Sequence, residues 1–397
     1  MKLAKRISKI SPSPTLSITA KAKRMQQEGI DVIGFGAGEP DFDTPLNIKE
    51  KAKTAIDKGF TKYTSTSGIK ELKEAICEKL KKDNFLEYSP EEVIVCCGAK
   101  HAIFNAIMVL CDKDDEVILP VPYWVSYLEM IKIAQAKPVF INTDAKTNFK
   151  ITPQQLKKAI TSRTKLLILN SPSNPTGTIY EKKDLEEIAD ILVKKDVFCL
   201  SDEIYEKLIY DGKQHLSIAS LGKDIKRLTI LINGVSKAYS MTGWRIGYAA
   251  GPKEILQAMA NLQDHSTSNP TSISQYASVE ALRGNQKDLE IMRKVFEERR
   301  NFMLEKINAI KLLSCIKPQG AFYCWVNVKN LFGKRIDGKV IKDSLSLADL
   351  LLTKAKVAVV PGCVFGDDNY IRLSYATSLD NINKGLERIK DFINNLK

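Results

Sequence analysis

The sequence predicts an α/β protein built on a mostly parallel sheet, with a smaller α+β domain beside it. From about residue 90 to residue 280, short apolar runs alternate with segments of helical periodicity. Parallel strands need long, usually helical connections, so this alternation favours a mostly parallel sheet covered on both faces. After residue 284 the pattern changes to one long charged helix and several short strand-like runs. A length of 397 residues agrees with one large domain and a smaller partner, or with two or three domains.

Six apolar runs in the first part have the length and the bounding residues of buried strands. Helices are expected between them, because residues such as Leu185, Ile188, Ala189 and Leu192 repeat at spacings of three and four. The expected strands cover residues 93–97, 117–119, 139–142, 166–169, 197–200 and 228–232.

The second part begins near Gly284-Asn285, where the alternation stops. A long charged helix is expected over 286–309 and an amphipathic helix over 380–396, with strand-like runs at 322–328, 357–360 and 370–374 between them. We therefore predict a large domain over residues 46–284. Residues 1–45 and 285–397 are predicted to form the small domain together.

Composition excludes several classes of protein. No apolar run approaches the length that crosses a membrane. With 60 basic against 47 acidic residues the formal charge is +13, but only 12 of the basic residues are arginines and the lysines are spread along the chain, which argues against a nucleic-acid partner. The eight cysteines form no Cys-x-x-Cys pair and there are three histidines, so no zinc cluster is expected and a reducing, cytoplasmic location is predicted.

Polar residues gather where the predicted parallel strands end, which is where open α/β sheets bind ligands. One strand is followed by Gly98-Ala-Lys100 at a helix start, and another by the block from Asn170 to Gly177. The remaining blocks are Ser201-Asp-Glu-Ile-Tyr205 and Asn233-Gly-Val-Ser-Lys237, with Arg245 eight residues later. One rim thus carries an anion-binding helix start, an amide, a carboxylate, a phenol, a lysine and an arginine.

This set of groups is what pyridoxal phosphate requires. Its aldehyde needs a lysine amine for a Schiff base, and its pyridine nitrogen needs a carboxylate that keeps it protonated. Its phosphate needs backbone N–H groups at a helix start, hydroxyl groups and an arginine. Its ring oxygen needs hydrogen-bond donors, and its ring face needs an aromatic side chain.

The same residues carry a resemblance to a known family. Gly234-Val-Ser-Lys237-Ala-Tyr-Ser-Met-Thr-Gly-Trp-Arg245-Ile-Gly247 resembles the lysine signature of class I aminotransferases. The blocks that end at Gly177 and Tyr205 resemble two other blocks of that family, and Gly36-Ala-Gly-Glu-Pro-Asp-Phe42 resembles its N-terminal block, all in the right order. The likeness runs from about residue 5 to the C-terminus and is strongest to the bacterial aspartate aminotransferase subgroup. It implies the fold of the fold-type I pyridoxal-phosphate-dependent transferases.

The resemblance implies catalytic roles for three residues, Lys237, Asp202 and Tyr205, and a cofactor contact for Asn174. Lys237 is expected to bind the cofactor and to move a proton between substrate and cofactor, and Asp202 to pair with the pyridine nitrogen. Tyr205 and Asn174 are expected to bind the ring oxygen. From the residues alone, Asp202 could instead cap a helix and Asn174 could instead shape the Asn-Pro turn.

The resemblance also implies the remaining cofactor contacts. Trp124 is expected to stack on the pyridine face, and Tyr63 to reach the phosphate of a neighbouring subunit, which predicts a homodimer with shared sites. The expected phosphate contacts are Gly98, Ala99, Lys100, Ser236 and Arg245.

Substrate contacts follow from the same likeness. Alternation along the strand at 370–374 puts Arg372 and Ser374 on the face opposite Leu373, and an arginine beside small residues suits a bidentate grip on a carboxylate. The backbone of Gly38 is expected to bind the same carboxylate. Lys100, with hydroxyl groups near Thr15, is expected to bind the distal carboxylate of a dicarboxylic substrate. Trp124 and Asn174 are expected to line the substrate site.

The predicted function is a ping-pong transamination from L-aspartate to 2-oxoglutarate. Relatives that also use prephenate carry a lysine before the Pro-Ser of the N-terminal arm, where this chain has Ser11, so prephenate is the less expected substrate. Alanine, aromatic or kynurenine donors, or a β-elimination, would use the same groups. Outside this class, a basic nucleotide- or nucleic-acid-binding α/β protein remains the alternative. A dehydrogenase is disfavoured, since the glycines from Gly34 to Gly38 lack the dinucleotide-binding spacing.

Overall fold

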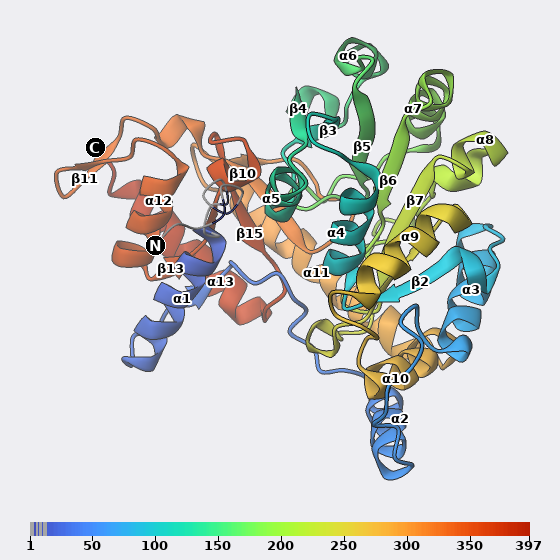
Figure 1. Cartoon of the computed structure of the whole chain (residues 1–397). Coiled ribbons are helices and arrows are strands. Elements are labelled where there is room, and N and C mark those ends of the chain that lie inside the picture. The colour runs from blue at the N-terminus through green and yellow to red at the C-terminus, as the bar shows by residue number, and fades with distance from the viewer. Residues whose placement is uncertain (1–3, 5–6, 8–9, 11–13) are drawn as a thin grey trace.

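The central feature of the molecule is a seven-stranded sheet of order β2-β8-β7-β6-β5-β3-β4 (Figure 1). The computed structural model describes residues 4, 7, 10 and 14–397, and only the backbone of residues 14–19. Neighbouring strands pair in parallel except at β8, which runs antiparallel to both β2 and β7. The predicted α/β class with a mostly parallel sheet is therefore confirmed. The strands are β2 (Val93–Cys96), β3 (Glu116–Val121), β4 (Lys137–Asn142), β5 (Thr164–Asn170), β6 (Phe198–Asp202), β7 (Thr229–Gly234) and β8 (Gly247–Ala250).

Strand β8 was not predicted from the sequence. Its four residues, Gly-Tyr-Ala-Ala, include no β-branched side chain and follow a turn motif, so nothing local marks them as a strand. These residues form a strand because β2 and β7, on either side, offer backbone groups that β8 can pair with. Several other strands are longer than predicted, and β5 and β6 end on the polar residues Asn170 and Asp202, which pair with each other in register. The ladder thus extends into residues that the apolar pattern excluded.

Helices cover both faces of this sheet, as the alternation of buried residues along the strands requires. On β5, Leu166 and Ile168 face one layer, whereas Leu167 and Leu169 face the other. The first layer contains α4 (Ala99–Leu110), α5 (Val125–Ile133) and α9 (Lys253–Asp264). The second contains α2 (Leu46–Asp57), α3 (Lys70–Asn84), α6 (Pro153–Ala159), α7 (Lys182–Lys195), α8 (Lys223–Lys226) and α10 (Ser272–Arg283).

The C-terminal part is built on a four-stranded antiparallel sheet of order β14-β15-β10-β9. Its strands are β9 (Ser314–Cys315), β10 (Tyr323–Asn327), β14 (Val360–Pro361) and β15 (Tyr370–Ser374). The helices here are α11 (Lys287–Asn308), α12 (Ser344–Leu350) and α13 (Leu379–Asn394), close to two of the predicted spans. A short hairpin joins β11 (Arg335–Ile336) to β12 (Lys339–Val340).

The predicted run at 357–360 is divided between two sheets. Strand β13 (Val357–Ala358) pairs in parallel with β1 (Ile33–Gly34), whereas β14 pairs with β15. This division brings the N-terminal segment, including α1 (Pro14–Gln27), beside the C-terminal part (Figure 1). The reason is tertiary, because the partner of β13 lies more than 300 residues earlier in the sequence.

One hydrophobic core cluster joins the two parts of the molecule. It contains Tyr323 and Leu373 from the four-stranded sheet together with Tyr205 and Leu208, which follow β6 of the large sheet. The division into domains at residues 46 and 284 stays a prediction. Within the described part of the chain, no helix is both long enough and apolar enough to cross a lipid bilayer.

Candidate active site

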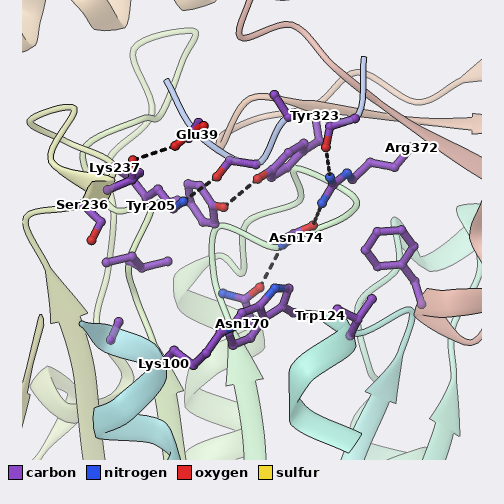
Figure 2. A pocket seen from close by; sticks show the side chains of 18 of the residues that line it. Glu39, Lys100, Trp124, Asn170, Asn174, Tyr205, Ser236, Lys237, Tyr323 and Arg372 are labelled. Atoms are coloured by element: carbon purple, nitrogen blue, oxygen red, sulfur yellow. Dashed lines mark hydrogen bonds between the residues drawn. The ribbon is translucent and has the colours of Figure 1, made fainter. Parts of the chain in front are cut away.

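A cavity of about 620 Å³ lies at the carboxyl ends of the parallel strands, between the two sheets. Asn170 and Asp202 reach it from the ends of β5 and β6, and Ala99 from the start of α4. Arg372 reaches it from β15 (Figure 2). Eleven of the residues predicted for the site line this cavity: Gly38, Ala99, Lys100, Trp124, Asn174, Asp202, Tyr205, Ser236, Lys237, Arg245 and Arg372.

Lys237 presents a primary amine to this cavity. Its Nζ donates a hydrogen bond to the carbonyl oxygen of Gly38 at 2.5 Å. Burial lowers the pKa of Lys237 to about 8, and the guanidinium groups of Arg372 and Arg245 act in the same direction, whereas the Glu39 carboxylate opposes them. A large share of this amine is therefore neutral and nucleophilic near pH 8.

Asp202 lies deeper, with only 4% of its surface exposed. Its Oδ2 accepts a hydrogen bond of 2.5 Å from the hydroxyl of Tyr127, and its Oδ1 accepts one from the backbone N–H of Ile204 at 3.2 Å. Burial raises the pKa of Asp202 to about 6, although both hydrogen bonds favour the ionised form. A buried carboxylate of this kind is suited to hold a positively charged group of a ligand.

Two hydrogen-bonded pairs of side chains lie in the cavity, Arg372 with Asn174 and Tyr205 with Tyr323 (Figure 2). Arg372 donates from Nη1 to Oδ1 of Asn174 and from Nη2 to the carbonyl oxygen of Gly36, both at 3.0 Å. Since the amide oxygen of Asn174 accepts from Arg372, its nitrogen is left as the donor for a ligand. Tyr205 is buried, and burial keeps the pKa of its phenol well above the usual value, so the hydroxyl stays protonated.

The start of α4 and Arg245 form a compact corner of the site. Gly98 is the N-cap residue of α4, with φ of +92°, a conformation that favours glycine. A side chain at this position would overlap with the guanidinium of Arg245. That guanidinium donates to the carbonyl oxygens of Thr242 at 2.8 Å and Cys97 at 3.2 Å. Backbone N–H groups at a helix start and a fixed guanidinium together suit a phosphate.

Lys100, the second residue of α4, lies over the ring of Trp124. The Nζ of Lys100 lies 5.1 Å from the centroid of the Trp124 ring, within cation–π range. Burial, and then the charge of Arg245, lower the pKa of Lys100 from its usual value. Trp124 is in turn packed edge-on against Tyr127 at 5.2 Å between ring centroids.

Three of the predicted site residues are not among those that line the cavity: Gly98, which lies beside it as the N-cap residue of α4, Tyr63 and Thr15. Tyr63 is 92% exposed and does not belong to the lining of the cavity in this single chain. Thr15 lies in α1, where only the backbone is described, and Ser11 lies outside the described residues. Each of these residues was assigned from a sequence motif, and a motif does not determine where a side chain lies in space.

Tyr127 and Tyr323 line the cavity and were not predicted. A signal for Tyr127 was present, because it follows Trp124 by three residues and a helix brings such residues onto one face. No comparable signal marks Tyr323, which lies in an apolar strand and whose hydroxyl meets that of Tyr205 at 2.8 Å.

The structure also collects three potential metal ligands that the sequence spacing did not reveal. The ligand atoms of Glu203, Glu206 and His215 all lie within 4.8 Å of one another. Glu206 forms an ion pair with buried Lys79, and Glu203 accepts hydrogen bonds from two serine hydroxyls and contacts His215 at 2.7 Å. These protein groups already compensate the carboxylates, so we assign the cluster a structural role.

Comparison with known proteins agrees with this geometry. The family model "Aminotransferase class I and II" matches residues 30–389. The chain belongs to this family. An aspartate aminotransferase from Bacillus subtilis (strain 168) is 51% identical over 99% of both chains. An aspartate/prephenate aminotransferase from Nitrosomonas europaea is 46% identical over 99% of this chain and 100% of its own.

Among solved structures, the aspartate aminotransferase from Rhizobium meliloti superposes with a TM-score of 0.97 at 46% identity, over 100% of both chains. The predicted fold-type I architecture is thereby confirmed over its full length. As a member of the aminotransferase family the chain is an enzyme. The family is therefore not one of nucleic-acid-binding proteins, which was the alternative from the sequence.

Proposed function

We propose that this aminotransferase uses pyridoxal phosphate to transfer the amino group of L-aspartate to 2-oxoglutarate. The observation that carries the proposal is the cavity that holds a largely desolvated lysine amine, a buried carboxylate and a fixed guanidinium together. The names of the relatives at 46–51% identity support aspartate as the amino donor.

The residues present fit the cofactor. Lys237 offers the amine that its aldehyde requires, and Asp202 offers the buried carboxylate for its ring nitrogen. The start of α4 and Arg245 fit the phosphate, because glycine at position 98 lets the guanidinium of Arg245 lie directly against the helix start. When bound, this cofactor supplies an electron-accepting ring that stabilises negative charge on the substrate α-carbon.

The protein's own groups would then perform distinct tasks. Asp202 would hold a proton on the ring nitrogen through a charge-assisted hydrogen bond. Tyr205 and Asn174 would donate hydrogen bonds to the ring oxygen. The free amine of Lys237 would accept a proton from the substrate α-carbon, and would return one when the amino group is transferred to the oxo acid. Its lowered pKa supports this role, since a neutral amine is the form that can accept a proton.

Substrate recognition is assigned to groups at the two ends of the cavity. Arg372, supported by Asn174 and Gly36, is placed to bind the α-carboxylate with both of its terminal nitrogens, and the backbone of Gly38 provides a further contact. Lys100 is proposed to bind the distal carboxylate, with help from Thr15. A Lys100→Met variant should lose catalytic efficiency for aspartate more than for alanine, because only aspartate carries the second carboxylate.

The proposal includes a homodimer and a cytoplasmic location. Tyr63 is almost fully exposed, and the apolar side chains of Leu46 and Ile56 are 64% and 54% exposed, which supports burial of this region against a second copy. All eight cysteines are free, which supports a reducing compartment. A sedimentation experiment that finds only monomers at assay concentration would contradict the assignment of Tyr63 to a partner's site.

A panel of amino donors tests the activity directly. Protein loaded with pyridoxal phosphate should convert aspartate with 2-oxoglutarate, and Lys237→Ala should abolish turnover while keeping the fold. If aspartate is inactive while an aromatic donor or alanine is active, the substrate assignment is wrong. Prephenate is the second candidate acceptor, because the Nitrosomonas europaea relative is named for it. Ser11→Lys should then raise prephenate use relative to 2-oxoglutarate.

A further inference from the structure

Tyr323 lies between Tyr205 and Arg372, two residues to which different tasks are assigned. It begins strand β10, pairs with Ser374 of β15, and is fully buried. Figure 2 shows its side chain between Tyr205 and Arg372. Its hydroxyl therefore points to the residue assigned to the cofactor ring oxygen, whereas its ring lies against the residue assigned to the substrate carboxylate.

The hydroxyl contact has a defined direction once a ligand binds. The hydroxyl oxygens of Tyr205 and Tyr323 are 2.8 Å apart, and each phenol can donate one hydrogen bond. If Tyr205 donates its proton to a ligand in the cavity, the hydrogen bond between the two phenols must come from Tyr323. A hydroxyl that accepts a hydrogen bond becomes a stronger donor, because chains of hydrogen bonds polarise one another.

The ring contact supports the guanidinium of Arg372. The Cζ atom of Arg372 lies 4.2 Å from the centroid of the Tyr323 ring, and the Phe365 ring lies at 5.2 Å. Two hydrogen bonds hold the edge of the guanidinium, and the aromatic ring supports its face. The orientation of the carboxylate-binding fork thus depends on Tyr323 as well as on its hydrogen-bond partners.

We propose that Tyr323 is a positioning residue whose hydroxyl strengthens Tyr205 as a hydrogen-bond donor and whose ring orients Arg372 for the substrate carboxylate. This inference rests on the proposed function and deepens it. The two contributions use different parts of one side chain, so they can be separated by substitution.

Two variants separate them. Tyr323→Phe removes the hydroxyl and keeps the ring, whereas Tyr323→Met removes the ring and retains much of the volume. Tyr375→Phe is the matched control, because Tyr375 is a fully buried phenol that donates to the carbonyl oxygen of Ala321 at 3.2 Å and does not line the cavity. Thermal melting of each variant reports any loss of stability.

The readouts are spectroscopic. In protein loaded with pyridoxal phosphate, the pKa of the lysine–cofactor linkage is measured from absorbance against pH, and the affinity for maleate, an unreactive dicarboxylate, from the change in the spectrum. Tyr323→Phe should raise the linkage pKa by about half a unit to one unit, as expected for one lost hydrogen bond, with maleate affinity changed less than about twofold. Tyr323→Met should also weaken maleate binding by about 3- to 30-fold.

The outcomes distinguish this inference from the proposed function. If Tyr323→Phe has the linkage pKa of the unmodified protein and of Tyr375→Phe, the hydroxyl role is wrong. If Tyr323→Met binds maleate normally, the ring role is wrong. An unmodified protein that stays colourless with excess pyridoxal phosphate would overturn the proposed function itself, and the inference with it.

Discussion

The hydrogen bond between Tyr127 and Asp202 offers a sharp test of how the site is tuned. Both side chains are buried, and the donor and acceptor oxygens are 2.5 Å apart. Tyr127→Phe removes the donor and keeps the ring that packs against Trp124. We expect the substitution to change the protonation of Asp202 rather than the fold.

The magnitude follows from the burial of the carboxyl group. A hydrogen bond to a charged group contributes about 1.5–3 kcal/mol, and one pKa unit corresponds to about 1.4 kcal/mol. Burial already raises the pKa of Asp202 to about 6, so the lost bond should raise it by a further one to two units or so. At pH 7 the ionised fraction would fall from roughly nine-tenths to between about a half and a tenth.

The assay is the affinity of the apoprotein for pyridoxal phosphate between pH 6 and pH 9. Because binding needs the ionised carboxylate, the affinity of Tyr127→Phe should be about 2- to 10-fold weaker at pH 7 and close to normal at pH 9. Tyr123→Phe serves as the control, since Tyr123 is buried nearby but does not line the cavity. A loss of affinity independent of pH would indicate damaged packing, and an unchanged affinity at every pH would refute the reasoning.

Three further predictions concern the lysine, the phosphate corner and the buried ion pair. Burial lowers the pKa of Lys237 to about 8, so the rate at which pyridoxal phosphate reacts with this amine should rise about tenfold for each pH unit up to pH 8 and level off above it. Stopped-flow absorbance measures this rate. Gly98→Ala should displace Arg245 and weaken pyridoxal phosphate binding by at least about tenfold, measured by titration. Lys79→Met should leave Glu206 buried without its cation, and urea denaturation should show a loss of about 3–5 kcal/mol.

A second measurement or a control variant accompanies each of these predictions. Between the lowered pKa of Lys237 and its usual value of 10.5, the unfolded chain binds more protons than the folded apoprotein. The free energy of unfolding should therefore rise with pH through that window, and Lys237→Met should remove the rise. The control for Gly98→Ala is Gly29→Ala, because Gly29 has φ of +81° but open space around it. This variant should show only the backbone strain, a loss of about 1 kcal/mol in the free energy of unfolding. Adding Glu206→Gln to Lys79→Met should restore part of the lost stability; no recovery would mean that lost packing, not the unpaired charge, is responsible.

The chemical groups of the site could be read from the sequence because most of them lie beside strand ends. Asp202 and Asn174 follow apolar runs, and the polar residues beyond such runs meet at one edge of a parallel sheet. Alternation along one strand also separated Arg372 from Leu373, and the structure places the first in the cavity and the second in the core. These are local patterns with a period that the backbone imposes.

The contacts that tune these groups were decided only by the tertiary structure. Tyr127 and Asp202 are 75 residues apart in the sequence, Tyr205 and Tyr323 are 118 apart, and Asn174 and Arg372 are 198 apart. Two of these three pairs join a segment that follows a strand of the large sheet to the four-stranded sheet, and the third joins a strand end to a covering helix. Periodicity assigns a side chain to a face, but its partner depends on how separate layers pack, and no local pattern encodes that packing.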